Sequence, residues 1–162
     1  MKDKVVLITG AKGGLGFFIT RRFLETGATV VGASLSISQQ DFPGPNFTAL
    51  AVDFTKAAAV NDAVQSVIRR FGRLDVLVHL LGGFAGGQSV AETDDATWEQ
   101  MRDLNVTSGF YVLRAAGPTS AKLRKRTNCG RWESDRSRTA SPTRGVHCVQ
   151  GCPRDVGPHG GA

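Results

Sequence analysis

A glycine-rich segment near the start of the chain, Thr9-Gly10-Ala11-Lys12-Gly13-Gly14-Leu15-Gly16, has the composition of an anion-binding turn. It follows the apolar run Val5 to Thr9 and precedes a segment whose apolar residues recur at helical spacing. Small residues let the backbone approach a phosphate, and the free N–H groups of a helix N-terminus favour negative charge. Glycine turns without a ligand are also common, so the glycines alone leave both interpretations open. The position at the first strand–helix junction favours dinucleotide binding.

The segments around this turn alternate between strand and helix patterns, which predicts an α/β fold with a parallel sheet and helices on both faces. Short β-branched and apolar runs predict strands at 5–9, 28–34, 47–53 and 74–83. Apolar residues at helical spacing predict helices at 17–27, 55–72 and 93–117. Thr55 is the expected N-cap of the second helix.

Four segments together resemble the classical short-chain dehydrogenase/reductase family, whose members bind NAD(H) or NADP(H). "TGAKGGLG" is similar to the family's TGxxxGxG pattern, and "VDFT", "LDVLVHLLGG" and "WEQMRDLN" follow in the family's order. The resemblance covers nearly all of residues 1–117. It implies a dinucleotide-binding domain over residues 1–117, with a partial Rossmann, doubly wound sheet of strand order 3-2-1-4. Residues 118–162 are expected to form an irregular, disordered basic tail.

The resemblance also assigns roles to residues. Asp53 would hydrogen-bond the adenine amino group, and Asn105 would be the one member of the catalytic tetrad in this chain. In the fourth-strand motif, His79-Leu80-Leu81-Gly82 replaces both asparagines of the family; His79 is expected to make a structural hydrogen bond, with ligand or base as the alternative. No metal site is expected. The expected cofactor-binding residues are Thr9, Gly10, Lys12, Gly13, Gly14, Leu15, Gly16, Ser34, Asp53, Phe54, His79 and Gly82.

Two residues favour NADP(H) slightly over NAD(H). An acidic residue at the end of the second strand would bind the ribose 2′-hydroxyl and select NAD, but Ser34 stands there. Lys12 in the glycine turn could meet a 2′-phosphate. The alternative is that Lys12 points into water.

The family's remaining catalytic residues have no counterpart here. In the family, a serine orients the substrate oxygen, and a tyrosine with a lysine four residues later performs the proton transfer. Tyr111 is the single tyrosine, and Ala115 stands four residues after it. The resemblance therefore implies an NAD(P)-dependent oxidoreductase acting on a small carbonyl or alcohol, which is inactive in the form of this chain. The alternative is a non-catalytic module that pairs with an intact homologue, or with itself, through the helix carrying Asn105.

The last third of the chain differs in charge and pattern. Residues 1–113 hold 10 basic and 11 acidic side chains, whereas residues 114–162 hold 10 basic and 3 acidic ones. Reading the codons allowed for Val146 to Pro153 from their second nucleotide permits Tyr-x-x-Ser-Lys-Ala-x-Leu, with Tyr and Lys at Val146 and Gln150. This matches the family's Tyr-x-x-x-Lys helix, so we interpret the tail as the result of a frame change after about residue 114.

Other interpretations of the tail are weaker. Its basic residues could contact nucleic acid, but shifted coding also yields arginine excess. His147, Cys148, Cys152 and His159 have spacings that zinc could use, but no scaffold is evident to hold them. The apolar run Val5 to Ile8 is too short for a signal peptide or a membrane span, so we expect a soluble cytoplasmic protein.

Overall fold

A computed structural model describes residues 1–122 of the chain, with side chains described to residue 117. Four parallel strands form its sheet in the order β3-β2-β1-β4, as expected from the sequence. The strands are β1 (Val5–Thr9), β2 (Thr29–Ser34), β3 (Phe47–Ala51) and β4 (Val76–His79). The fold is therefore the α/β arrangement that the alternation of elements predicts.

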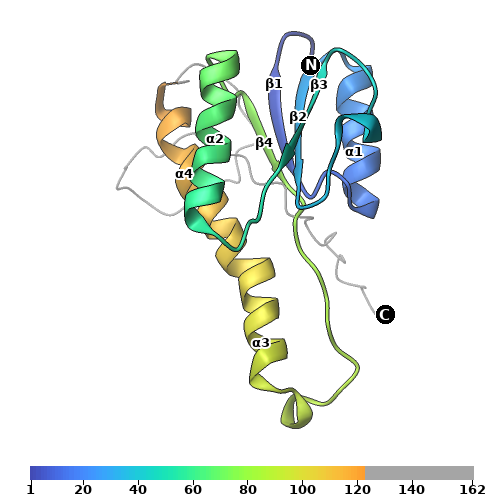
Figure 1. Cartoon of the computed structure of the whole chain (residues 1–162), viewed down its shortest axis with the longest axis vertical. Helices are drawn as coiled ribbons and strands as arrows, with labels where there is room; N and C mark the ends of the chain where they lie inside the picture. Colours follow the sequence, from blue (N-terminus) through green and yellow to red (C-terminus); the bar gives the residue numbers. More distant parts are fainter. Residues whose placement is uncertain (123–162) are drawn as a thin grey trace, which may run out of the picture.

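Helices cover both faces of the sheet (Figure 1). Helix α1 (Gly14–Glu25) lies on one face, while α2 (Ala57–Phe71) and α4 (Ser108–Lys122) pack side by side on the other. Helix α3 (Asp95–Arg102) and the short turn η2 (Val90–Glu92) extend beyond the carboxyl ends of the strands. None of the helices in the described part of the chain is long and apolar enough to cross a membrane.

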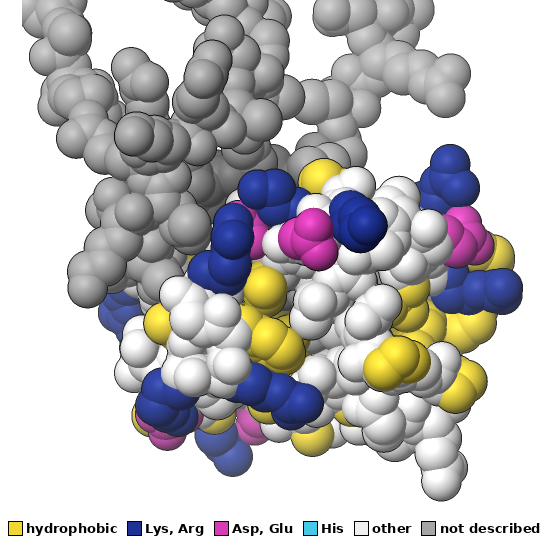
Figure 2. Space-filling model, turned by 90° about the horizontal axis from the view of Figure 1, so that it is seen from above, with side chains coloured by type: hydrophobic (Ala, Val, Ile, Leu, Met, Phe, Trp, Pro, Cys, Tyr) yellow, Lys and Arg dark blue, Asp and Glu magenta, His cyan; other side chains and the backbone are white. Residues whose placement is uncertain are grey.

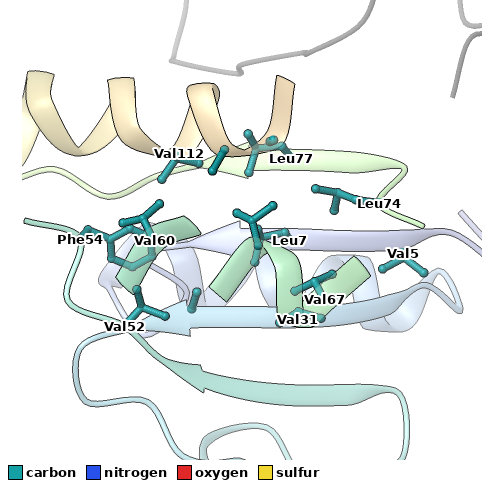
Figure 3. Close-up of a cluster of buried hydrophobic side chains, with 14 residues drawn as sticks. Val5, Leu7, Val31, Val52, Phe54, Val60, Val67, Leu74, Leu77 and Val112 are labelled. Atoms are coloured by element: carbon teal, nitrogen blue, oxygen red, sulfur yellow. The ribbon is translucent and has the colours of Figure 1, made fainter. Parts of the chain in front are cut away.

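The sheet separates two hydrophobic clusters. Successive residues of a strand point to opposite faces, so Leu7 packs toward α2 and α4 while its neighbours in β1 pack toward α1. Figure 3 shows the first cluster, in which Val60 and Val67 of α2 and Val112 of α4 meet the strands. The strand β1 is buried along its whole length, which explains its continuous apolar run.

Several element boundaries differ from the sequence-based expectation, including those of the fourth strand, the second helix and the segment 93–117. The fourth strand ends at His79 rather than at residue 83. Helix α2 begins at Ala57 with Lys56 as its N-cap, because the Thr55 amide and hydroxyl are bonded to Asp53. The segment 93–117 is not one regular helix: the π-helical turn η3 (Asp103–Thr107) separates α3 from α4, and α4 continues five residues past 117.

Charged side chains surround the opposite end of the sheet, where the strands begin (Figure 2). The carboxylate of Asp75 accepts the Val5 N–H at 2.9 Å and pairs with the side chains of Lys4 and Arg73. This arrangement ties the start of β1 to the segment that leads into β4. It is a structural contact at the end of the sheet opposite to the glycine turn.

Candidate functional site

The carboxyl ends of the strands bring the expected site residues to one edge of the sheet. Thr9, the last residue of β1, lies beside Ala33 of β2 on one side and His79 of β4 on the other. Ser34 ends β2 next to Ala51 of β3. The parallel register therefore places the glycine turn, the end of β2 and the end of β4 together, in the crevice where open α/β sheets bind ligands.

Close backbone packing explains two glycines of the turn. Gly10 has a left-handed backbone (φ +72°), and a Cβ there would lie 2.9 Å from the carbonyl carbon of Leu80. A Cβ on Gly16 would overlap the carbonyl group of Gly10. These two glycines let the first turn of α1 pack directly on the end of β1. They are required by the turn itself, whether or not a ligand binds.

Gly14 is different because it faces open space. Apart from its chain neighbours and its own helix backbone, a Cβ on Gly14 would meet no atom of the described residues within 4 Å. The first helical hydrogen bond of α1 is from Phe17 N–H to Gly13 O (2.8 Å), so the amides of Gly14, Leu15 and Gly16 precede it. No side chain in the described part of the chain caps this helix start. Free amides, an open approach and a helix dipole suit a phosphate group, so the turn fits a dinucleotide.

Lys12 connects the glycine turn to the end of β2. Its backbone N–H donates to Ser34 Oγ (3.2 Å), and its Nζ donates to Ser36 O (2.9 Å). The same Nζ forms an ion pair with Asp41 Oδ1 at 3.2 Å. The alternative that Lys12 simply points into water is therefore wrong.

Sequence reasoning missed Asp41 at this site. Asp41 ends the short helical turn η1 (Gln39–Asp41), and its Oδ2 accepts the Ser38 N–H (2.7 Å) and hydroxyl (3.1 Å). The hydrogen bond from the Ser38 backbone is the main cause that lowers the pKa of Asp41, so this carboxylate is ionised at neutral pH. The spacing Ser38-x-x-Asp41 is a capping-box signal, which could have predicted the local turn but not the contact of Asp41 with Lys12.

Asp53, which is expected at the adenine, and Phe54, which is expected to bind the cofactor, occupy different surroundings. Asp53 lies after β3, where its Oδ1 accepts the amide (3.0 Å) and hydroxyl (2.6 Å) of Thr55 and its Oδ2 pairs with Lys56 (3.3 Å). The side chain of Phe54 is buried in the cluster beneath α2. Asp53 thus keeps an acceptor group at the expected position, while Phe54 contributes packing.

His79 makes the structural hydrogen bond expected from the sequence. Its Nδ1 and the Thr9 hydroxyl are 2.7 Å apart, which joins the ends of β4 and β1. The side chain is only 3% exposed, and Nε2 has no partner among the described residues. Gly109 of α4 covers it, since a Cβ there would lie 3.3 Å from Nε2. Burial lowers the pKa of His79, so the ring is neutral and acts as a packed structural group.

Asn105 lies in the π-helical turn η3 and holds the loop after β4. Its Oδ1 accepts Gly83 N–H (3.1 Å), and its Nδ2 donates to Gly83 O (3.0 Å) and Met101 O (2.9 Å). A Cβ on Gly82 would lie 2.9 Å from Asn105 Oδ1, which explains the glycine there. The side-chain amide is thus fully engaged with the backbone at the rim of the crevice. The catalytic role of Asn105 remains a prediction.

The other sequence-based hypotheses concern residues outside the described part of the chain. They include the frame change that would place a tyrosine and a lysine at Val146 and Gln150, and the zinc and nucleic-acid alternatives for the tail. Within residues 1–122, no group of three or more His, Cys, Asp and Glu side chains could hold a metal ion.

The chain is similar to proteins of one family. A sequence model described as short chain dehydrogenase matches residues 4–127. An L-fucose dehydrogenase from Bos taurus is 35% identical over 126 residues, which cover 75% of this chain and 46% of that enzyme. The chain spans about half the length of the curated relatives that it matches.

Solved structures give the same result. The 3-ketoacyl-(acyl-carrier-protein) reductase from Brucella melitensis, complexed with NADH, is 28% identical with a TM-score of 0.69, over 76% of this chain and 54% of that one. ElxO with NADP bound is 27% identical with a TM-score of 0.70, over 76% of this chain and 52% of that one. One neighbour thus carries NADH and the other NADP.

Proposed function

This chain belongs to the short-chain dehydrogenase family, and we propose that residues 1–117 form the dinucleotide-binding half of an NAD(P)-dependent oxidoreductase. The observation that carries the proposal is the open start of α1. Outside its own helix backbone and chain neighbours, no atom of the described residues lies within 4 Å of a Cβ position on Gly14, and three amides that no described side chain caps precede the first helical bond. This arrangement suits the pyrophosphate of a dinucleotide. The cytoplasmic location expected from the sequence stays part of the proposal.

In this proposal each residue of the crevice has a distinct task. The amides of Gly14, Leu15 and Gly16 bind the pyrophosphate, and the Asp53 carboxylate accepts from the adenine. The Thr9–His79 hydrogen bond keeps the ends of β1 and β4 aligned beneath the cofactor. In an intact enzyme of the family, the bound cofactor would supply the hydride chemistry for a small carbonyl or alcohol substrate.

NADP(H) is the slightly favoured cofactor. Ser34 puts no carboxylate at the end of β2, and Lys12 Nζ lies there, 2.9 Å from Ser36 O. A cation at this position supports a 2′-phosphate. The similar structures do not separate the two cofactors, because they include complexes with NADH and with NADP.

Gly14→Asp tests the proposed binding site. The new side chain fits the open space at Gly14, and an acidic residue suits the first turn of a helix, so the fold is retained. Its carboxylate would repel the pyrophosphate, and we expect binding of NADPH and NADH, measured by calorimetry, to weaken by about 100-fold or more. Gly117→Asp is the matched control, since a Cβ on Gly117 also meets no atom of the described residues within 4 Å. Equal binding by wild type and Gly14→Asp would overturn the proposal.

The proposal includes the absence of useful turnover. Tyr111 is the single tyrosine of the chain, and Ala115 follows it at the spacing where the family has lysine. Without that pair the chain lacks the proton donor that the family uses. Reduction of a carbonyl compound by this polypeptide with NADPH would contradict this part of the proposal. Sequencing the gene tests the frame change, which requires codons at Val146 and Gln150 that give Tyr and Lys in the shifted frame.

A second candidate function is a non-catalytic pairing module, favoured by one face of η3 and α4. Val106, Phe110 and Leu113 recur at helical spacing and are 65%, 56% and 37% exposed. An apolar stripe of this kind, next to Asn105, suits pairing with an intact homologue or with a second copy of the chain.

Phe110→Asp tests the pairing function. The exposed side chain adds little to the stability of the monomer, but a charge in the centre of the stripe would disrupt a helix–helix contact. We expect the variant to lose co-purification with a family homologue, or its own dimer in light scattering. Phe84→Asp is the matched control, because Phe84 is also exposed but lies in the loop after β4. An equal effect of both variants would exclude the stripe as the contact.

A further inference from the structure

The strongest feature that the proposed function leaves unused is the ion pair between Lys12 and Asp41. Lys12 is the residue that supports a 2′-phosphate, yet its Nζ already contacts Asp41 Oδ1 at 3.2 Å and Ser36 O at 2.9 Å. The two side chains are 43% and 23% exposed, so the pair lies at a partly shielded surface. The cation and the anion therefore occupy the same end of the crevice.

Asp41 is held in place independently of Lys12. Its second oxygen, Oδ2, accepts the Ser38 N–H at 2.7 Å and the Ser38 hydroxyl at 3.1 Å. These bonds fix the carboxylate at the end of η1 and keep it ionised. Any anion that pairs with Lys12 Nζ must therefore approach a fixed negative charge that lies 3.2 Å from the same nitrogen.

We propose that Asp41 sets the balance between the two cofactors. It weakens the preference for NADP(H), because it competes with the 2′-phosphate for Lys12. The inference rests on the proposed dinucleotide site. A 2′-phosphate gains the attraction of Lys12 but meets the repulsion of Asp41, so the two effects largely cancel. A 2′-hydroxyl meets no such repulsion and can donate a hydrogen bond to a carboxylate. The pair thus makes the site tolerant of both cofactors, with NADP(H) only slightly ahead.

Asp41→Asn is the decisive variant. Asparagine keeps an acceptor for the Ser38 N–H, so η1 retains its cap, while the negative charge is removed. We expect the dissociation constant of NADPH to fall about tenfold, and that of NADH to change less than about twofold, as one nearby unit charge predicts. The same contrast is expected between 2′,5′-ADP and 5′-AMP, which probe only the adenosine end. Circular dichroism verifies the fold of each variant.

Two further variants make the result specific. Asp62→Asn removes the same charge from the exposed face of α2 and controls for net charge. In a Lys12→Met background, Asp41→Asn is expected to improve NADPH binding much less. The reason is that the improvement depends on a Lys12 side chain that no longer pairs with Asp41. If Asp41→Asn binds both cofactors and the ratio of their dissociation constants is unchanged, the inference is overturned while the proposed function stands. A wild-type chain that binds neither dinucleotide would overturn the proposed function, and the inference with it.

Discussion

His79 is a residue whose protonation would cost stability. It is buried between β4 and α4, its Nδ1 bonds the Thr9 hydroxyl, and burial is the cause that lowers its pKa. In the unfolded chain the same ring takes up a proton near its ordinary pKa of about 6.5. Stability falls with decreasing pH wherever the unfolded state binds more protons than the folded state. The contribution of neutral His79 to the free energy of unfolding is therefore fully present above about pH 6.5 and is lost progressively below it.

We expect the free energy of unfolding to decrease on going from about pH 7 to pH 5, by up to about 1.4 kcal/mol per pH unit for this one group. His79→Asn should flatten that part of the profile, because asparagine does not titrate but can still bond the Thr9 hydroxyl. Urea unfolding at a series of pH values measures both proteins, and the histidines of the tail contribute equally to each. Identical pH profiles would show that His79 does not titrate differently in the two states.

Single residues of the site were predictable from the sequence where the backbone pattern fixes them. The glycine turn and Ser34 lie where the strand–helix pattern puts them. Asp41 was not predictable as a partner of Lys12, because the contact crosses from the turn to η1 through the tertiary fold. For the same reason the three hydrogen bonds of Asn105 to Gly83 and Met101 could not be read from spacing.

At the scale of elements, the outer edge of β3 is blocked by a side chain. Asn46 O and Val52 N–H face β2, so the alternate groups Phe47 O and Ala49 N–H point away from the sheet. Gln39 of η1 fills these two positions: its Nε2 donates to Phe47 O (2.9 Å) and its Oε1 accepts from Ala49 N–H (3.2 Å). Its amide thereby imitates the N–H and C=O groups that one residue of a neighbouring parallel strand would offer, and it occupies the positions that another strand would use.

Gln39→Ala should open this edge. The loss of two hydrogen bonds predicts a decrease of about 1–2 kcal/mol in the free energy of unfolding, together with faster aggregation. Gln40→Ala changes the neighbouring residue of the same turn and is the matched control. Denaturant unfolding and light scattering measure the two effects. If Gln40→Ala aggregates as fast as Gln39→Ala, the Gln39 amide does not protect the edge.

The elements themselves were predictable in type and order because each has a clear period. The apolar runs of β1 and β2 and the helical stripe of α2 gave their positions closely. The division of residues 93–117 was not predictable. The apolar pattern continues through η3, and the π-helical turn becomes evident only from backbone bonds such as Ser108 N–H to Asp103 O, which joins residues five apart.

At the scale of the whole molecule, the two sheet edges are unequal. The outer edge of β3 has Gln39, whereas β4 pairs only with β1 in the part of the chain that the structure describes. Large apolar side chains are also exposed on both layers, including Phe18 of α1 and Phe110 of α4. Unpaired strand edges and exposed apolar side chains are the features that lead to association.

We therefore expect the protein to be marginally stable, to associate as its concentration rises, and to unfold irreversibly on heating. Unfolding would release the apolar strands, and β4 would offer an edge on which they could pair before refolding. Repeated calorimetric scans test reversibility, and size-exclusion chromatography with light scattering over a concentration series tests association. Asp41→Asn provides a useful comparison, because it changes the crevice without altering either edge. Superimposable scans of a monomer, with a Tm independent of concentration, would contradict this expectation. They would show that the edge of β4 that is unpaired in the described part of the chain causes neither association nor irreversible unfolding.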